Sequence, residues 1–174
     1  IFSIPLTTHT SYGYIFNAEL SPVGQVENDF EIFMAEQGME PTNSSRELRF
    51  PSFMRRSIFD GSLFHIGNSA SFLEPLEATA ITIVLFQLRQ ISAWLITRLT
   101  DWGDDNCAAI LDAQAVEFIE QVSWFVAWHY ARGSTRDTQF WRYARNIYRE
   151  QSAACCSRPA YQQFQEYVSM GNEL

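Results

Sequence analysis

Residues 67–81 read Gly67-Asn68-Ser69-Ala70-Ser71-Phe72-Leu73-Glu74-Pro75-Leu76-Glu77-Ala78-Thr79-Ala80-Ile81. The apolar run at residues 63–66 ends at Gly67, and a loop of small residues leads to Pro75 and then to a long helical pattern. This order predicts a strand, a tight loop and the N-terminus of a helix. Free N–H groups and the positive end of a helix dipole suit such a site to an anionic cofactor or a small anion.

The composition limits the classes of protein to which this chain can belong. With 174 residues, 47% of them hydrophobic, it forms one domain or a large piece of one. The net charge of −8 argues against a nucleic-acid partner, because such binders need basic patches. The 3 cysteines make no disulfide framework, which favours a cytoplasmic protein. No charge-free apolar run reaches the length of a bilayer span, so we expect no membrane partner.

The periodicity changes from strands to helices along the chain. Strand patterns occupy residues 10–17, 47–50 and 63–66, and a helix opened by Ser21-Pro22 lies between the first two. Helical patterns follow from Thr79 onward, at residues 79–99 and 113–131. A capping box, Ser134-x-x-Asp137, opens a third helix of this region with Phe140, Trp141, Ala144 and Ile147 turned inward. Ser157-Arg158-Pro159 opens the last helix. These patterns predict an α+β fold with a strand-rich portion at residues 1–76 and a helical region at residues 77–174.

Three motifs carry a resemblance to a known family. Residues 67–81 closely resemble the flavin-binding and halide-binding segment of the FAD-dependent, tryptophan-type halogenases. Ile4-Pro5 and the later Tyr12-Gly13-Tyr14-Ile15-Phe16 are similar to the family's W-x-W-x-I-P strand and its G-x-G-Y-V-Y continuation. His129-Tyr130 and Thr135-Arg136-Asp137-Thr138-Gln139-Phe140-Trp141-Arg142-Tyr143 are similar to its H-Y-x-x-x-x-R-x-D-T-x-F-W-R-Y helix pair. The resemblance spans roughly residues 1–150 and implies the C-terminal part of an FAD-dependent monooxygenase/halogenase fold.

The resemblance also implies a role for each matching residue. Glu77 would be the catalytic glutamate. The flavin would be bound by Gly67, Asn68, Pro75 and Leu76, and the halide by the backbone amides of Thr79 and Ala80. The family often has Gly where Ala80 stands, but an alanine amide donates equally well. The substrate would be bound by Ile4, Pro5, His129, Tyr130, Phe140 and Trp141.

The implied activity is oxidative halogenation of an aromatic small molecule such as an indole, with reduced FAD (FADH2), O2 and chloride or bromide. A flavin reductase would supply the reduced cofactor, and a homodimer is one candidate assembly. In members that bind free tryptophan, an acid precedes the Asp-Thr pair and receives the substrate's ammonium. Here that position is Arg136, which repels a cation and cannot accept its hydrogen bonds. We therefore expect free tryptophan to be a poor substrate.

Two family features are missing from this sequence. All 12 cationic residues are Arg, so the family's catalytic lysine is absent, and no G-x-G-x-x-G fingerprint occurs. We expect both to lie upstream, in an N-terminal dinucleotide-binding half absent from this chain. On this interpretation the chain alone is inactive.

Several alternatives stay open at this stage. Residues 67–81 can be an ordinary strand-to-helix turn capped by Thr79, with Glu77 as a helix-start acid. His9, His65 and His129 have no metal-ligand spacing, so we expect no metal site. A flavin-dependent aromatic monooxygenase of the same fold remains possible because Phe2 replaces a family Trp. The other alternative is a non-catalytic helical interaction module.

Overall fold

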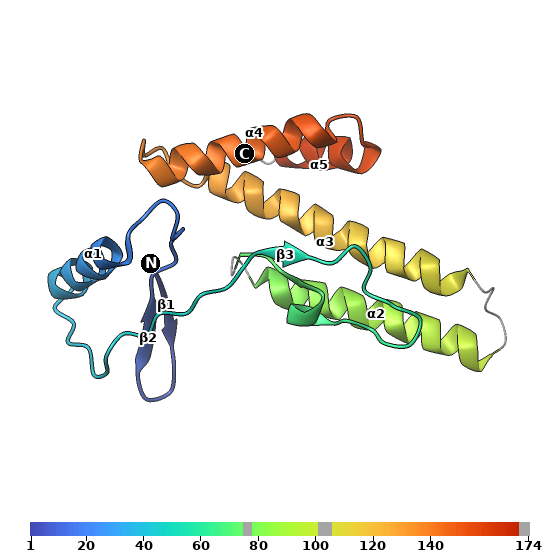
Figure 1. The fold of residues 1–174 in the computed structure, drawn as a ribbon, viewed down its shortest axis with the longest axis horizontal. Coiled ribbons are helices and arrows are strands. Elements are labelled where there is room, and N and C mark those ends of the chain that lie inside the picture. Colours follow the sequence, from blue (N-terminus) through green and yellow to red (C-terminus); the bar gives the residue numbers. More distant parts are fainter. Residues whose placement is uncertain (75–77, 101–105, 171–174) are drawn as a thin grey trace. The chain divides into compact units, whose positions relative to one another are not determined.

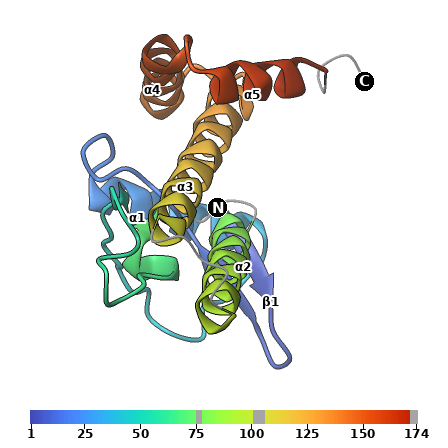
Figure 2. The same ribbon diagram turned by 90° about the vertical axis from the view of Figure 1, so that its right-hand side faces the viewer.

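The computed structural model describes residues 1–74, 78–100 and 106–170. The chain divides into two units, which are shown as ribbons in Figures 1 and 2. The first unit contains residues 1–49 and 138–140, and the second contains residues 50–137 and 141–174. The fold class is α+β, with short strands and a mainly helical remainder.

The first unit is built from a β-hairpin and one helix. Strand β1 (Phe2–Pro5) pairs antiparallel with β2 (Thr10–Gly13), and helix α1 (Val23–Glu36) follows. Phe2 faces Gly13 across the hairpin, and a Cβ at Gly13 would lie 2.3 Å from the Phe2 ring. A side chain at position 13 would therefore have to displace the exposed ring of Phe2. The second strand is shorter than the predicted residues 10–17 because its last residue, Gly13, already pairs with Phe2, the first residue of β1.

The second unit consists mainly of helices, with one short pair of strands among its described residues. Helix α2 (Thr79–Leu99) lies beside α3 (Cys107–Arg132), as both ribbon views show. Helices α4 (Gln139–Cys155) and α5 (Pro159–Met170) complete the unit. Its core is made of Ile58, Ala70, Ile83, Ala115, Ile119, Val122 and Val126. The apolar stripe that the sequence predicts along residues 113–131 therefore supplies most of the α3 side of the core.

Two of the predicted strands are absent and another pair takes their place. Residues 47–50 and 63–66 form no strand, whereas β3 (Phe53–Met54) pairs with β4 (Ser71–Phe72). Residues 57–66 instead fold back at the Asp60 turn, and the rings of Phe59 and Phe64 stack at 4.3 Å. Hydrogen bonds to α3 hold this segment as a loop. The Asp112 carboxylate of α3 accepts the N–H groups of Ile58 at 2.6 Å and Phe59 at 3.0 Å.

The capping box predicted at Ser134 is also wrong. The Ser134 hydroxyl accepts the N–H of Arg136 at 3.1 Å, two residues on rather than three. Helix α4 begins at Gln139 rather than just after Ser134, and the Asp137 carboxylate pairs with Arg142 at 3.3 Å and Arg145 at 3.2 Å. Within α4, Ala144 is buried as expected, but Ile147 is 40% exposed and does not point inward.

Helix α2 is long and apolar enough, by length and composition, to cross a membrane. The mean hydropathy of its most apolar 18 residues is 1.4, and 17% of that stretch is buried. The sequence pattern did not lead us to expect this, because Arg89 and Arg98 interrupt the apolar run. One such helix in the described residues is weak evidence for a membrane span, since core helices of soluble proteins pass the same test. The absence of a membrane partner therefore stays a prediction.

Candidate functional site

The loop that follows the Phe64 region is held against helix α2. Residues Gly67–Ser69 form a 3-10 turn, and Gly67 has a φ of +58°, in the left-handed region. The N–H of Gly67 donates to the side-chain oxygen of Gln87 at 2.8 Å. A Cβ at Gly67 would lie 3.2 Å from a methyl group of Val84. Glycine is thus favoured here twice, by the backbone conformation and by the close approach to the helix.

The far side of the loop is held by hydrogen bonds from Ser69 and Arg55. The Ser69 hydroxyl accepts the N–H of Ile66 and donates to its carbonyl, both at 2.9 Å. The Arg55 guanidinium donates to the Ser69 carbonyl at 2.7 Å. Asn68, between these anchors, is exposed. The loop therefore presents Asn68 on a backbone that is fixed on both sides.

Helix α2 begins at an unusual backbone turn. Ala78 has a φ of +54°, and its carbonyl accepts the first helical hydrogen bonds, from Ile81 at 2.9 Å and Thr82 at 3.4 Å. The amides of Thr79 and Ala80 come before these bonds, so they belong to the set of N–H groups that a helix leaves for other acceptors. Thr79 is buried and Ala80 is exposed. This end of the helix suits a small anion.

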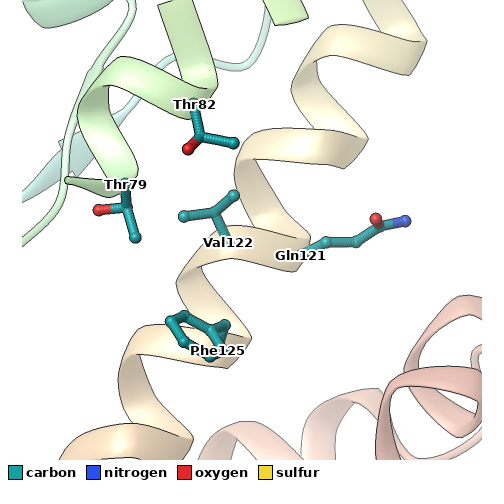
Figure 3. Close-up of a pocket in the computed structure, with 5 residues that line it drawn as sticks. All are labelled: Thr79, Thr82, Gln121, Val122 and Phe125. Carbon is teal, nitrogen blue, oxygen red and sulfur yellow. The ribbon is translucent and has the colours of Figure 1, made fainter. Parts of the chain in front are cut away.

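A pocket of about 330 Å³ lies beside this helix end. Figure 3 shows its five lining residues: Thr79 and Thr82 come from α2, and Gln121, Val122 and Phe125 come from α3. The lining is mostly apolar and includes the aromatic ring of Phe125. Thr79 and Thr82 line the pocket from the N-terminal turn of α2. Neither Gln121 nor Thr82 stands out in the sequence, because each is a single polar residue on a helix.

The structure brings some of the predicted substrate residues together. His129 and Tyr130 end α3, and the Tyr130 ring lies 6.4 Å from the ring of Trp141, the third residue of α4. The His129 ring lies 5.8 Å from that of Phe125, which links this group to the pocket wall. These two pairs, Tyr130 with Trp141 and Phe125 with His129, lie near the C-terminal end of α3 and are together called the aromatic group. Ile4, Pro5 and Phe140 belong to the first unit and are described there alone.

Glu74 is a residue that the sequence reasoning missed. Burial raises the pKa of its carboxyl above the ordinary value. Burial also raises the pKa of Tyr130, and the charge of Glu74 raises it further. This coupling places a half-buried carboxylate within electrostatic reach of the aromatic group. No sequence signal could have found it, because the two residues are far apart in the chain and Pro75 made Glu74 look like a loop acid.

Three of the predicted site residues lie outside the described residues. They are Pro75, Leu76 and Glu77, which follow Glu74 directly. Within the part of the chain that the structure describes, no three His, Cys, Asp or Glu side chains gather to hold a metal ion.

The family model for tryptophan halogenase matches residues 1–173. The chain belongs to the tryptophan halogenase family. It is 25% identical over 146 residues to tryptophan 7-halogenase RebH of Lentzea aerocolonigenes, an alignment that covers 81% of this chain and 26% of that protein. This chain thus spans about a quarter of the length of its curated relative.

Solved structures agree on the fold of this tryptophan halogenase family member. The thermophilic tryptophan halogenase Th-Hal from Streptomycin violaceusniger superposes with a TM-score of 0.65 at 23% identity, over 83% of this chain and 27% of that one. BrvH, a flavin-dependent halogenase from Brevundimonas sp. BAL3, superposes with a TM-score of 0.57 at 26% identity, over 74% of this chain and 25% of that one.

The described residues fit one side of the flavin site that the family implies. The left-handed Gly67 carries no Cβ where one would meet Val84, so the loop lies flat on α2 and its outer face is backbone and the exposed Asn68. The loop rests on α2. The backbone N–H groups at the start of this same helix can donate hydrogen bonds to an anion. Donors of this type suit a reduced, anionic flavin and a halide rather than a cationic ligand.

Proposed function

We propose that the intact protein is an FAD-dependent halogenase, which halogenates an aromatic small molecule oxidatively with reduced FAD, O2 and chloride or bromide. One observation carries the proposal: the left-handed Gly67 loop is hydrogen-bonded to α2, the helix whose first amides are left for other acceptors, in a chain that matches the family over residues 1–173. The chain holds neither a lysine nor a dinucleotide fingerprint, so we assign both to polypeptide outside these residues.

The loop is the proposed binding site of the flavin, and the N-terminus of α2 is the proposed binding site of the halide. We assign Gly67 and Asn68, with Pro75 and Leu76, to the flavin. Bound reduced flavin would supply the electrons that activate O2. The amides of Thr79 and Ala80 would hold the halide, because N–H donors at a helix N-terminus stabilise an anion and remain donors whatever the side chain.

The aromatic group at the end of α3 would bind the substrate. His129, Tyr130 and Trp141, with Phe140, Ile4 and Pro5, are the proposed substrate residues. Aromatic rings favour a flat aromatic ligand through stacking or edge contacts, which supports an indole or a phenol. Arg136 is exposed and cationic, so it disfavours a substrate with an ammonium group at that position. Free tryptophan is therefore not the proposed substrate.

Glu77 is the proposed catalytic residue, acting beside a lysine supplied from outside this chain. A separate flavin reductase is the proposed partner, and we propose a cytoplasmic location. A homodimer remains one candidate assembly.

The test uses the intact protein with a flavin reductase, NADH, FAD, O2, bromide and a panel of indoles and phenols. Mass spectrometry identifies brominated products by their isotope pattern. We expect wild type to halogenate, Glu77→Gln to lose at least a hundredfold in rate, and Glu117→Gln to match wild type, because Glu117 is an exposed carboxylate on α3. A hydroxylated product formed without halide would show a monooxygenase. Failure to bind flavin would leave the interaction module.

A further inference from the structure

Gln87 is a fully buried polar side chain on the core-facing side of α2. Its exposed fraction is 0%, and it lies one turn after the core residue Ile83. A buried primary amide is costly unless its polar atoms are hydrogen-bonded, so an apolar residue would be the ordinary choice here. The side-chain oxygen accepts the N–H of Gly67 at 2.8 Å. The side-chain nitrogen has no hydrogen-bond partner among the described residues.

The position of Gly67 on α2 depends on this bond and on one close contact. The missing Cβ of Gly67 would lie 3.2 Å from Val84, one turn before Gln87, so the loop backbone rests directly on the helix. Packing alone allows the loop to slide along an apolar surface, because such contacts are non-directional. A hydrogen bond to a single N–H fixes the position along the helix.

Helix α2 therefore links two parts of the proposed site. Its first residues carry the amides of Thr79 and Ala80, and Gln87 lies eight residues after Thr79. At a rise of about 1.5 Å per residue, the helix separates the two points by roughly 12 Å. A helix of this length is stiff on that scale. The distance from the loop to the helix N-terminus is thus set where Gln87 holds Gly67.

We propose that Gln87 is a positioning residue, which keeps the flavin-binding loop at a fixed separation from the halide-binding amides at the start of α2. This inference rests on the proposed function. Gln87 itself touches neither ligand; it acts through Gly67. The halide must lie beside the flavin to be oxidised, so an error in this separation weakens productive halide binding more than it alters the folded structure.

Asp112 provides a matched comparison for a purely structural tie. Its carboxylate accepts the N–H groups of Ile58 and Phe59, so it anchors the same segment of chain to a helix of the same unit. It binds Ile58 and Phe59 rather than Gly67 itself. Losing a merely structural tie lowers the amount of active protein and therefore the apparent kcat, but leaves the KM for halide unchanged.

The experiment measures bromide-dependent halogenation by the intact protein, together with FAD affinity from fluorescence quenching. Gln87→Met keeps the side-chain length and removes the amide. We expect it to raise the KM for bromide by roughly three- to tenfold, the factor of an ordinary hydrogen bond, with a smaller change in kcat. Gln87→Glu keeps an acceptor oxygen at the same reach, so it should raise the KM for bromide less than Gln87→Met does. Asp112→Ala should lower kcat without moving KM.

The possible outcomes separate the inference from the function on which it rests. If Gln87→Met shows the wild-type KM, or if Asp112→Ala shifts KM equally, Gln87 is only a structural tie and the inference fails. If wild type itself does not halogenate, the proposed function fails and the inference falls with it. If Gln87→Met does not fold, Gln87→Asn replaces it. The asparagine side chain keeps the amide but is one carbon too short to reach Gly67. An unchanged KM for bromide in that variant also overturns the inference.

Discussion

Replacing Gly67 by alanine tests the geometry of the loop directly. Gly67 has a φ of +58°, where an L-residue with a Cβ costs roughly 1–2 kcal/mol. The new Cβ would also lie 3.2 Å from Val84, closer than ordinary van der Waals contact. Reduced freedom of the unfolded chain returns about 0.4–1 kcal/mol. Gly67→Ala should therefore destabilise the loop by about 1–2 kcal/mol, most of it from the backbone conformation.

Hydrogen exchange of the intact protein measures this change where it occurs, because local opening of a loop is visible without global unfolding. The amides of the Gly67–Ser69 turn should exchange roughly tenfold faster in Gly67→Ala, the factor for about 1.4 kcal/mol. A second variant, Val84→Ala, removes the contacting methyl groups. The double variant should be less destabilised than the sum of the two single variants by about 0.5 kcal/mol or more.

Gly24→Ala is the matched control for this experiment. Gly24 lies within α1, and a Cβ added there meets nothing within 4 Å. Gly24 is the second residue of α1 and alanine is the better helix former, so this variant should not speed exchange in α1 and should leave exchange at the loop unchanged. Unchanged exchange at the loop in Gly67→Ala, or strict additivity with Val84→Ala, would refute the reasoning that the loop rests on α2 through a left-handed glycine.

Three further predictions concern charge. Arg136→Glu should raise kcat/KM for tryptophan relative to indole by about tenfold, because a carboxylate attracts the substrate ammonium; a competition assay with both substrates measures the ratio, and an unchanged ratio contradicts the assignment. Burial raises the pKa of Glu74, so the fold favours its protonated form and loses stability as the pH rises through the ordinary carboxyl range. Glu74→Gln should therefore raise the Tm at pH 7, with the gain disappearing below about pH 4, and should lower the pKa of Tyr130 in a spectroscopic titration. Arg158 forms a two-pronged ion pair with Glu120, so Arg158→Met should destabilise the α3–α5 contact by about 1 kcal/mol, less at high salt, as hydrogen exchange of α5 would show.

The sequence predicted the helical elements well because their signals are local. Pro22, Gly38 and Pro159 mark helix ends through backbone constraints that act within a few residues. Helix α2 begins at Thr79 as expected, and the apolar stripe of α3 supplies the core. The capping box at Ser134 failed because the Ser134 hydroxyl accepts the N–H of Arg136 and the helix begins only at Gln139.

The strands and the support of the site depend on distant partners, so local patterns could not find them. Residues 47–50 and 63–66 have strand-like sequences but form no strand, and the Asp112 carboxylate binds the backbone of Ile58 and Phe59 between them. Gln87 was overlooked for the same reason, since a glutamine in an apolar helix gives no indication that it holds Gly67. A polar residue on the buried face of an amphipathic helix is the signal that could have identified it.

The measurement that tests the central claim most directly is the dependence of product formation on bromide concentration in the intact protein supplied with reduced FAD, O2 and indole. The account predicts a brominated indole whose rate of formation saturates with bromide and shifts to a chlorinated product when chloride replaces it. A hydroxylated indole formed at the same rate with and without halide would contradict the claim that the start of α2 holds a halide beside the flavin.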